Sequence, residues 1–124
     1  MTKFKSQGFH NTFRNARKGF SLVVKSEINI RIHIIIALIV LILATLLKFS
    51  TLEFCVLLLV ISHVIVTEML NTAIEFTLDS IFHNKFSRMV GMAKDISAGA
   101  VMFATVTSIF VGIILFGKHI LLVL

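Results

Sequence analysis

The chain has 124 residues, of which 57% are hydrophobic, and its mean hydropathy is +1.00. This is enough chain for one domain and far more apolar than an ordinary soluble one, which excludes most soluble classes. The net charge is +6, and seven of the twelve Lys and Arg residues fall within the first 31 positions. Because apolar segments adjoin this basic arm, we expect an anionic lipid surface as its partner and no nucleic acid.

The first predicted element is an amphipathic helix over about 9–25. Its apolar side chains recur at helical spacing, and basic residues fill much of the remainder: Phe9, Phe13, Ala16, Phe20 and Val24 on one side, with Arg14, Arg17, Lys18 and Lys25 among the others. Such a helix lies on a membrane surface. A disordered basic leader, which would also include Lys3 and Lys5, is the alternative.

Three membrane-spanning helices follow, over about 29–48, 52–81 and 96–117. The second is predicted as one long helix because neither Gly nor Pro occurs from 54 to 90. The third has no charged residue over 96–117 and is rich in small residues such as Ser97 and Gly99, which let membrane helices approach closely.

The basic residues predict the orientation of the spans. The N-terminal arm and the 82–95 connection carry ten Lys and Arg residues, against Lys48 and Lys118 on the other side. Positive charge stays in the cytoplasm, so we expect a cytoplasmic N-terminus and an external C-terminus. The predicted fold is one all-α integral membrane domain over 1–124, with three transmembrane helices and an N-terminal amphipathic surface helix.

Polar residues share one face of the second span near its cytoplasmic end. Glu68, Asn71, Glu75 and Asp79 follow each other at intervals of three or four residues. Charge within a bilayer is costly, so these groups are expected to bind a metal, accept a proton or pair with basic residues. The alternative is a helix end whose carboxylates are merely solvated in the headgroup zone.

Charged residues also precede the first and third spans. Glu27 and Arg31, with His33 just after, have the spacing of a simple helix-stabilising ion pair. Asp95 is expected as a cap or first-turn acid of the third span, where Lys94 would hold a phosphate near the helix N-terminus. An anionic cytoplasmic site of this kind suits Mg²⁺ bound with substrate phosphates, and a proton-coupled transporter almost as well.

Several motifs resemble the prokaryotic diacylglycerol kinase family, which includes the undecaprenol kinases of Gram-positive bacteria. They are E-M-L-N-T-A-I-E at 68–75, Asp79, A-K-D at 93–95, E-I-N-I-R-I-H at 27–33, and the spacing of Phe13, Ala16 and Gly19. The resemblance runs from about residue 9 to residue 116. It implies a homotrimer in the bacterial inner (cytoplasmic) membrane, with active sites shared between subunits, that transfers the γ-phosphate of ATP to a membrane lipid hydroxyl.

The resemblance also implies roles for the residues that contact the lipid. Glu68 would be the general base that takes the proton of the lipid hydroxyl, and Asn71 would help orient the base and the phosphate. Arg31 would make a lesser contribution to substrate binding. Undecaprenol is the expected lipid, and diacylglycerol is the alternative.

The nucleotide would be bound by the remaining acidic and basic residues of the motifs. By resemblance, Glu27 and Glu75 would hold the Mg²⁺ that bridges ATP oxygens, while Lys94 would contact the phosphates and Asp95 would help bind the nucleotide. The chain departs from the family at Ser87, where many members carry a His.

Two other classes compete with a lipid kinase. A small oligomeric proton- or cation-coupled transporter would explain Glu68 and Glu75 as ion sites. A membrane subunit or regulator without chemistry would leave the polar face of the second span unexplained. Lipid phosphorylation separates the kinase from both.

Overall fold

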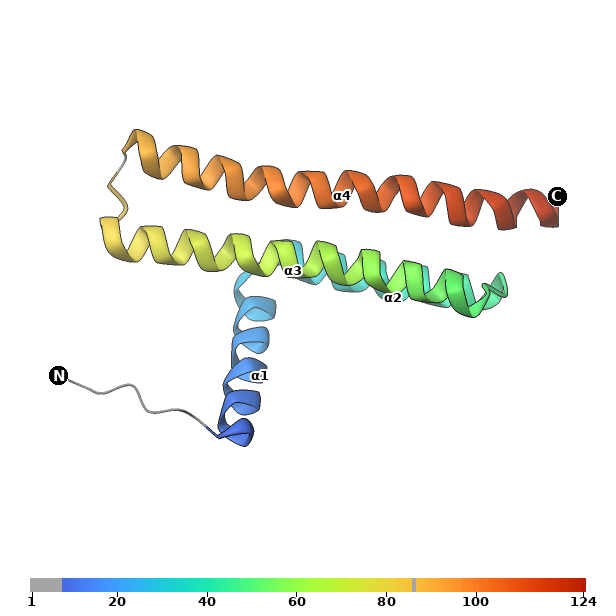
Figure 1. The fold of residues 1–124 in the computed structure, drawn as a ribbon, viewed down its shortest axis with the longest axis horizontal. Coiled ribbons are helices and arrows are strands. Elements are labelled where there is room, and N and C mark those ends of the chain that lie inside the picture. The colour runs from blue at the N-terminus through green and yellow to red at the C-terminus, as the bar shows by residue number, and fades with distance from the viewer. Residues whose placement is uncertain (1–7, 86) are drawn as a thin grey trace.

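A computed structural model describes residues 8–85 and 87–124 (Figure 1). Lys3 and Lys5 of the expected basic arm, and Phe86 of the expected cytoplasmic connection, lie outside the described residues. The described part of the chain forms four helices: α1 (Phe9–Ser26), α2 (Ile28–Leu46), α3 (Thr51–Phe82) and α4 (Arg88–Val123).

The helices α2, α3 and α4 are each long and apolar enough to cross a membrane. The expected class, an all-α membrane protein with three transmembrane helices and an N-terminal helix, is therefore confirmed for the described residues. The second span is one continuous helix of 32 residues, as the lack of Gly and Pro in this segment predicts.

The helix α1 runs across the direction of the other three helices (Figure 1). It is separated from α2 by Glu27 alone, whose backbone is extended at φ −115° and ψ 115°. Only Val23 of α1 is buried, so the helix is attached by its last turns and is otherwise exposed. A basic amphipathic helix held across three spans is suited to lie in the membrane interface.

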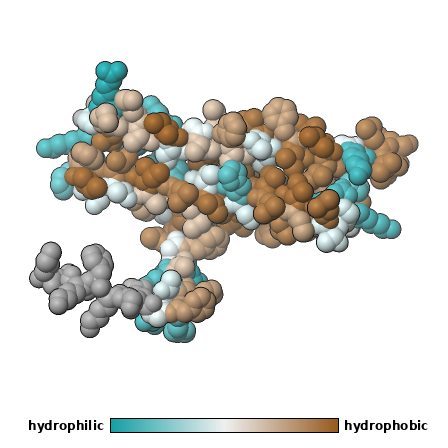
Figure 2. Space-filling view, in the orientation of Figure 1, coloured by the Kyte–Doolittle hydropathy of each residue, from teal (hydrophilic) through white to brown (hydrophobic). Residues whose placement is uncertain are grey.

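The helix α3 is the centre of the bundle, with α2 packed on one side and α4 running antiparallel along it. Small residues lie buried between the helices, among them Ala37, Ala44 and Ala104, and they allow close approach of the backbones. Most large apolar side chains of the three helices point outward. Figure 2 shows these side chains over most of the bundle and hydrophilic side chains gathered toward its two ends, as expected for a protein surrounded by lipid.

The end of the bundle at the α2–α3 turn is closed by a polar contact between α3 and α4. The Ser50 hydroxyl accepts from the Glu53 backbone N–H at 3.2 Å, and the Glu53 carboxylate accepts from the Ser50 N–H at 3.3 Å, which forms a capping box. The other Glu53 oxygen lies 2.5 Å from His119 Nε2, and the His119 ring stacks on Phe49. His119, which the sequence pattern leaves without a role, thus joins the two helices.

The helix α4 begins at Arg88 rather than near residue 96. Ser87 is its N-cap, and the Ser87 hydroxyl accepts from the Val90 backbone N–H at 3.2 Å. The expectation that Asp95 caps this helix is therefore wrong, and Lys94 lies inside the helix rather than at its N-terminus. The reason is that Ser87 is a good cap and no Pro separates it from the apolar span, so the helix runs through Gly91 without interruption. As a result, the tips of α3 and α4 project past the level of α1 (Figure 1).

Candidate active site

The four polar residues predicted to share a face occupy the C-terminal half of α3. Glu68 is buried, with 7% of its surface exposed, whereas Asn71, Glu75 and Asp79 are half-buried. A buried carboxylate is costly without a polar partner. The side chains that approach this face from α2 and α4 therefore define the candidate site.

The partner of Glu68 is His33 on α2. His33 Nε2 lies 3.5 Å from Glu68 Oε1, and both side chains are largely shielded from solvent. This contact joins residues far apart in the sequence, so the spacing of residues within either helix does not reveal it. At 3.5 Å the contact is longer than a good hydrogen bond, which leaves the carboxylate able to accept a proton or a further hydrogen bond.

The next turn of α3 is part of a hydrogen-bonded chain of three side chains. The Asn71 Nδ2 group donates to Glu75 Oε1 at 3.3 Å. The hydroxyl of Ser97, from α4, donates to Asn71 Oδ1 at 2.6 Å. Ser97 was expected only as a small packing residue, and sequence analysis therefore missed its polar contact.

The tips of α3 and α4 are joined by an ion pair between Lys94 Nζ and Asp79 Oδ1 at 2.7 Å. These two residues line a cavity of about 310 Å³ together with Asn84, Lys85 and Asp95. Lys94 and Asp95, expected together in one site, thus both line this cavity. Its mixed charge and its position beyond the apolar part of the bundle suit a polar, water-borne ligand.

Glu27 and Arg31 do not form the ion pair that their spacing suggests. Glu27 is the N-cap of α2: its carbonyl oxygen accepts from the Arg31 backbone N–H at 3.5 Å, but its extended backbone does not direct the side chain as a helical residue would. Arg31 instead donates from its guanidinium to the Lys25 carbonyl oxygen at 3.4 Å. Within residues 8–85 and 87–124, no ion pair links Glu27 to Arg31.

The donor groups of the site can be compared with those that Mg²⁺ requires. In the described part of the chain, no three His, Cys, Asp or Glu side chains form a group that could hold a metal ion. Mg²⁺ is, however, commonly bound by one or two carboxylates together with substrate phosphates. Glu27 and Glu75 are both half-buried carboxylates, and Glu75 accepts one N–H from Asn71, so each keeps oxygen atoms of the type that Mg²⁺ prefers.

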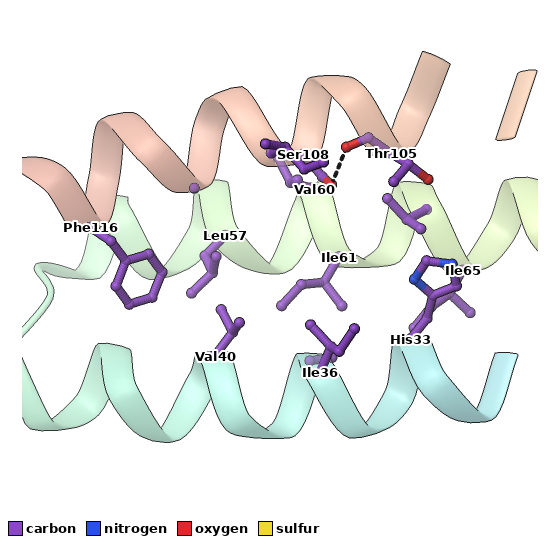
Figure 3. A pocket seen from close by; sticks show the side chains of 14 residues that line it. His33, Ile36, Val40, Leu57, Val60, Ile61, Ile65, Thr105, Ser108 and Phe116 are labelled. Carbon is purple, nitrogen blue, oxygen red and sulfur yellow. Dashed lines mark hydrogen bonds between the residues drawn. The ribbon is translucent and has the colours of Figure 1, made fainter. Parts of the chain in front are cut away.

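An apolar cavity of about 360 Å³ lies between α2, α3 and α4. Figure 3 shows His33 at one end of the cavity and Phe116 at the other, with Ile36, Val40 and Ile61 among the side chains between them. Since His33 also contacts Glu68, the buried carboxylate lies beside a hydrophobic space. The region thus combines a proton acceptor, a polar cavity and a place for a hydrocarbon chain.

The sequence of the chain was compared with those of known proteins and protein families. Residues 14–116 match the family model described as prokaryotic diacylglycerol kinase. A diacylglycerol kinase of Synechocystis sp. is 34% identical over 101 residues, a match that covers 82% of this chain and 58% of that protein. An undecaprenol kinase of Bacillus subtilis is 35% identical over 108 residues, which is 87% of each chain. The chain thus spans little more than half of the Synechocystis relative and most of the Bacillus one. It belongs to the prokaryotic diacylglycerol kinase family.

Proposed function

We propose that the protein is a lipid kinase of the bacterial cytoplasmic membrane that transfers the γ-phosphate of ATP to the hydroxyl of undecaprenol. Diacylglycerol is the second candidate substrate. Undecaprenol is favoured because the relative that matches this chain over most of its own length is named undecaprenol kinase.

The observation that carries the proposal is the position of Glu68 between two cavities of opposite character. Glu68 contacts His33, which lines the apolar cavity, while farther along α3 Asp79 and Lys94 line the polar cavity. A lipid with its hydrocarbon chain among the spans would present its hydroxyl near Glu68. A nucleotide arriving from water would meet the tips of α3 and α4 first.

In the proposed reaction, Glu68 takes the proton of the lipid hydroxyl as the lipid oxygen bonds to the γ-phosphorus. The bond between the γ-phosphorus and the oxygen of the leaving ADP breaks in the same step. Asn71 orients the base and the phosphate, and Arg31 makes a lesser contact with the substrate. Phosphoryl transfer depends mainly on positioning and neutralisation of charge, which this set of residues would supply.

The nucleotide is proposed to bind through the acidic and basic residues around the base. Glu27 and Glu75 would hold Mg²⁺, which neutralises phosphate charge when bound, and Lys94 would contact the phosphates directly. Asp95 would help hold the nucleotide at the polar cavity. For Lys94 to reach a phosphate, its contact with Asp79 must open or be shared.

We further propose that three subunits assemble and that each active site draws residues from two of them. Two observations support the assembly. Large apolar side chains of the spans are exposed in the single chain. A side-chain carbon added at Gly99 would meet nothing within 4 Å, so this small residue leaves α4 open to close approach by another helix. The proposed orientation keeps the N-terminus and the tips of α3 and α4 in the cytoplasm.

The test is transfer of radiolabel from [γ-³²P]ATP to lipid by the purified protein in mixed micelles with Mg²⁺. Undecaprenol and diacylglycerol are offered in separate reactions, and a reaction with EDTA controls for the metal. We expect label in undecaprenol above diacylglycerol, and none with EDTA. Folded oligomeric protein that labels neither lipid would contradict the proposal, and proton or cation flux in liposomes would then support the transporter.

A further inference from the structure

Ser97 is unusual among the hydroxyl side chains of the spans. Thr45, Thr67, Thr77, Thr107 and Ser108 each donate to a backbone carbonyl of their own helix. This is the usual way in which an apolar helix satisfies a hydroxyl. The Ser97 hydroxyl instead reaches from α4 to Asn71 on α3, at 2.6 Å, and Ser97 is buried with 7% of its surface exposed.

The contacts on its two sides together set the orientation of the Asn71 amide. An amide side chain has an oxygen that only accepts and a nitrogen that only donates, in nearly the same shape. The Asn71 nitrogen faces Glu75 Oε1 at 3.3 Å, where it donates to a carboxylate oxygen. Ser97 supplies the matching donor on the other side, to Asn71 Oδ1.

The resulting chain runs from Ser97 through Asn71 to Glu75. Its first bond links two helices, so the orientation of Asn71 on α3 depends on where α4 places the Ser97 hydroxyl. One N–H of Asn71 is used by Glu75, and its second N–H remains available for an oxygen of the substrate. Without the Ser97 hydroxyl, Asn71 Oδ1 loses this partner. Of the two hydrogen bonds, the one to Glu75 then holds the amide alone, and the side chain is freer to turn away from Glu75.

We propose that Ser97 is a positioning residue for phosphoryl transfer, which acts by holding the Asn71 amide with its nitrogen toward Glu75. This inference rests on the proposed lipid kinase function and adds a residue that the family motifs at 68–75 and 93–95 do not contain. Ser97 does not touch the reacting atoms. Its effect should therefore appear in the rate of the chemical step and not in the affinity for nucleotide.

The experiment compares Ser97→Ala with Ser97→Thr and with the control Thr107→Ala in the full-length protein. Thr107 lies in the same helix, but its side chain is exposed and its hydroxyl donates to the Phe103 carbonyl, so its loss should leave the site unchanged. We expect Ser97→Ala to lower kcat about five- to tenfold, from the loss of one buried hydrogen bond, with the KM for ATP within about twofold of wild type. Ser97→Thr, which keeps the hydroxyl, should recover most of the rate.

A merely structural role would give a different result. Ser97→Ala with a kcat within about twofold of wild type, or a lowered kcat that Ser97→Thr does not recover, would overturn the inference. If Ser97→Thr is too bulky to fold, Ser97→Cys replaces it, and the weaker thiol donor should give a kcat between those of wild type and Ser97→Ala.

A second readout separates failure of this inference from failure of the proposed function. The ¹⁵N NMR signals of the Asn71 side-chain amide should shift in Ser97→Ala and stay unchanged in Thr107→Ala. If the wild-type protein phosphorylates neither lipid, the proposed function and the positioning role built on it both fail, whereas the NMR comparison still decides whether Ser97 orients Asn71. An active wild type with unshifted Asn71 signals in Ser97→Ala would overturn this inference alone.

Discussion

The ion pair between Lys94 and Asp79 is well placed to act on a ligand and poorly placed to stabilise the fold. The two atoms are 2.7 Å apart, but more than a third of each side chain is exposed. Pairs as exposed as this contribute little to the free energy of unfolding because water and salt screen them. The pair therefore keeps the Lys94 ammonium group at the polar cavity and adds little to the stability of the fold.

Replacement of Lys94 should weaken nucleotide binding and leave the protein folded. A charge-assisted contact with a phosphate is worth about 1.5–3 kcal/mol, so Lys94→Met should raise the KM for ATP by about ten- to hundredfold. Steady-state kinetics at varied MgATP measures this change. Arg88→Met, at the exposed first residue of the same helix, is the matched control and should change the KM by less than about threefold. An equal rise in both variants would mean that net charge, rather than Lys94, binds the phosphates.

Single residues also show which parts of the site a sequence can predict. Glu68, Asn71, Glu75 and Asp79 were found because the period of one helix places them on one face. Their partners His33, Ser97 and Lys94 come from other helices, and the register between two helices is not written in the spacing of either one. The Glu27–Arg31 pair was predicted wrongly because helical spacing was applied across a residue with extended backbone.

Among the elements, the start of α4 departs most from expectation. Hydropathy marks the apolar part of a helix, near 96–117, whereas the helix itself begins where its N–H groups find a cap. Ser87 provides that cap and extends α4 beyond its apolar part. Ser87, the position at which the sequence departs from the motif it resembles, therefore has a structural role as a helix cap.

Loss of the Ser87 hydroxyl should destabilise the first turn of α4. Removal of an N-cap side chain costs about 1 kcal/mol, so Ser87→Ala should lower the free energy of unfolding by about that amount. Ser87→Asp, which can still accept the Val90 N–H, should retain wild-type stability. Reversible unfolding in mixed micelles measures both, with Ser80→Ala on the exposed surface of α3 as the control. Equal stability of Ser87→Ala and Ser87→Asp would contradict the capping role.

For the whole molecule, the distribution of basic residues predicts which end faces the cytoplasm. In a Cys55→Ala background, an impermeant maleimide added to intact cells should label Lys118→Cys near the end of α4. The same reagent should not label Lys85→Cys in the α3–α4 connection until the membrane is opened. Both positions are exposed in the structure, so the difference reports topology. Labelling of Lys85→Cys in intact cells would reverse the orientation and move the polar cavity to the outer face.

The overall class was predictable because it follows from hydropathy and helix period alone. The break between α1 and α2 falls between the predicted ranges 9–25 and 29–48, but the single extended residue that makes it, Glu27, was not identified, since no Gly or Pro marks it. The association of subunits was also not predictable from residue spacing, because no sequence motif in the chain marks a subunit contact. Its support comes from exposed apolar side chains and open small residues, features that a single sequence leaves ambiguous between lipid and protein neighbours.

The central claim, that phosphoryl transfer depends on the buried carboxylate of α3, is tested most directly by Glu68→Gln. Transfer of label from [γ-³²P]ATP to undecaprenol is measured for this variant and for Glu53→Gln, which alters a carboxylate at the opposite end of the same helix. Both variants are first checked for wild-type oligomeric state and helix content. Loss of a general base predicts that Glu68→Gln turns over about 10²- to 10⁴-fold more slowly, while Glu53→Gln stays near wild type. A folded Glu68→Gln protein that retains activity within about tenfold of wild type would contradict the account.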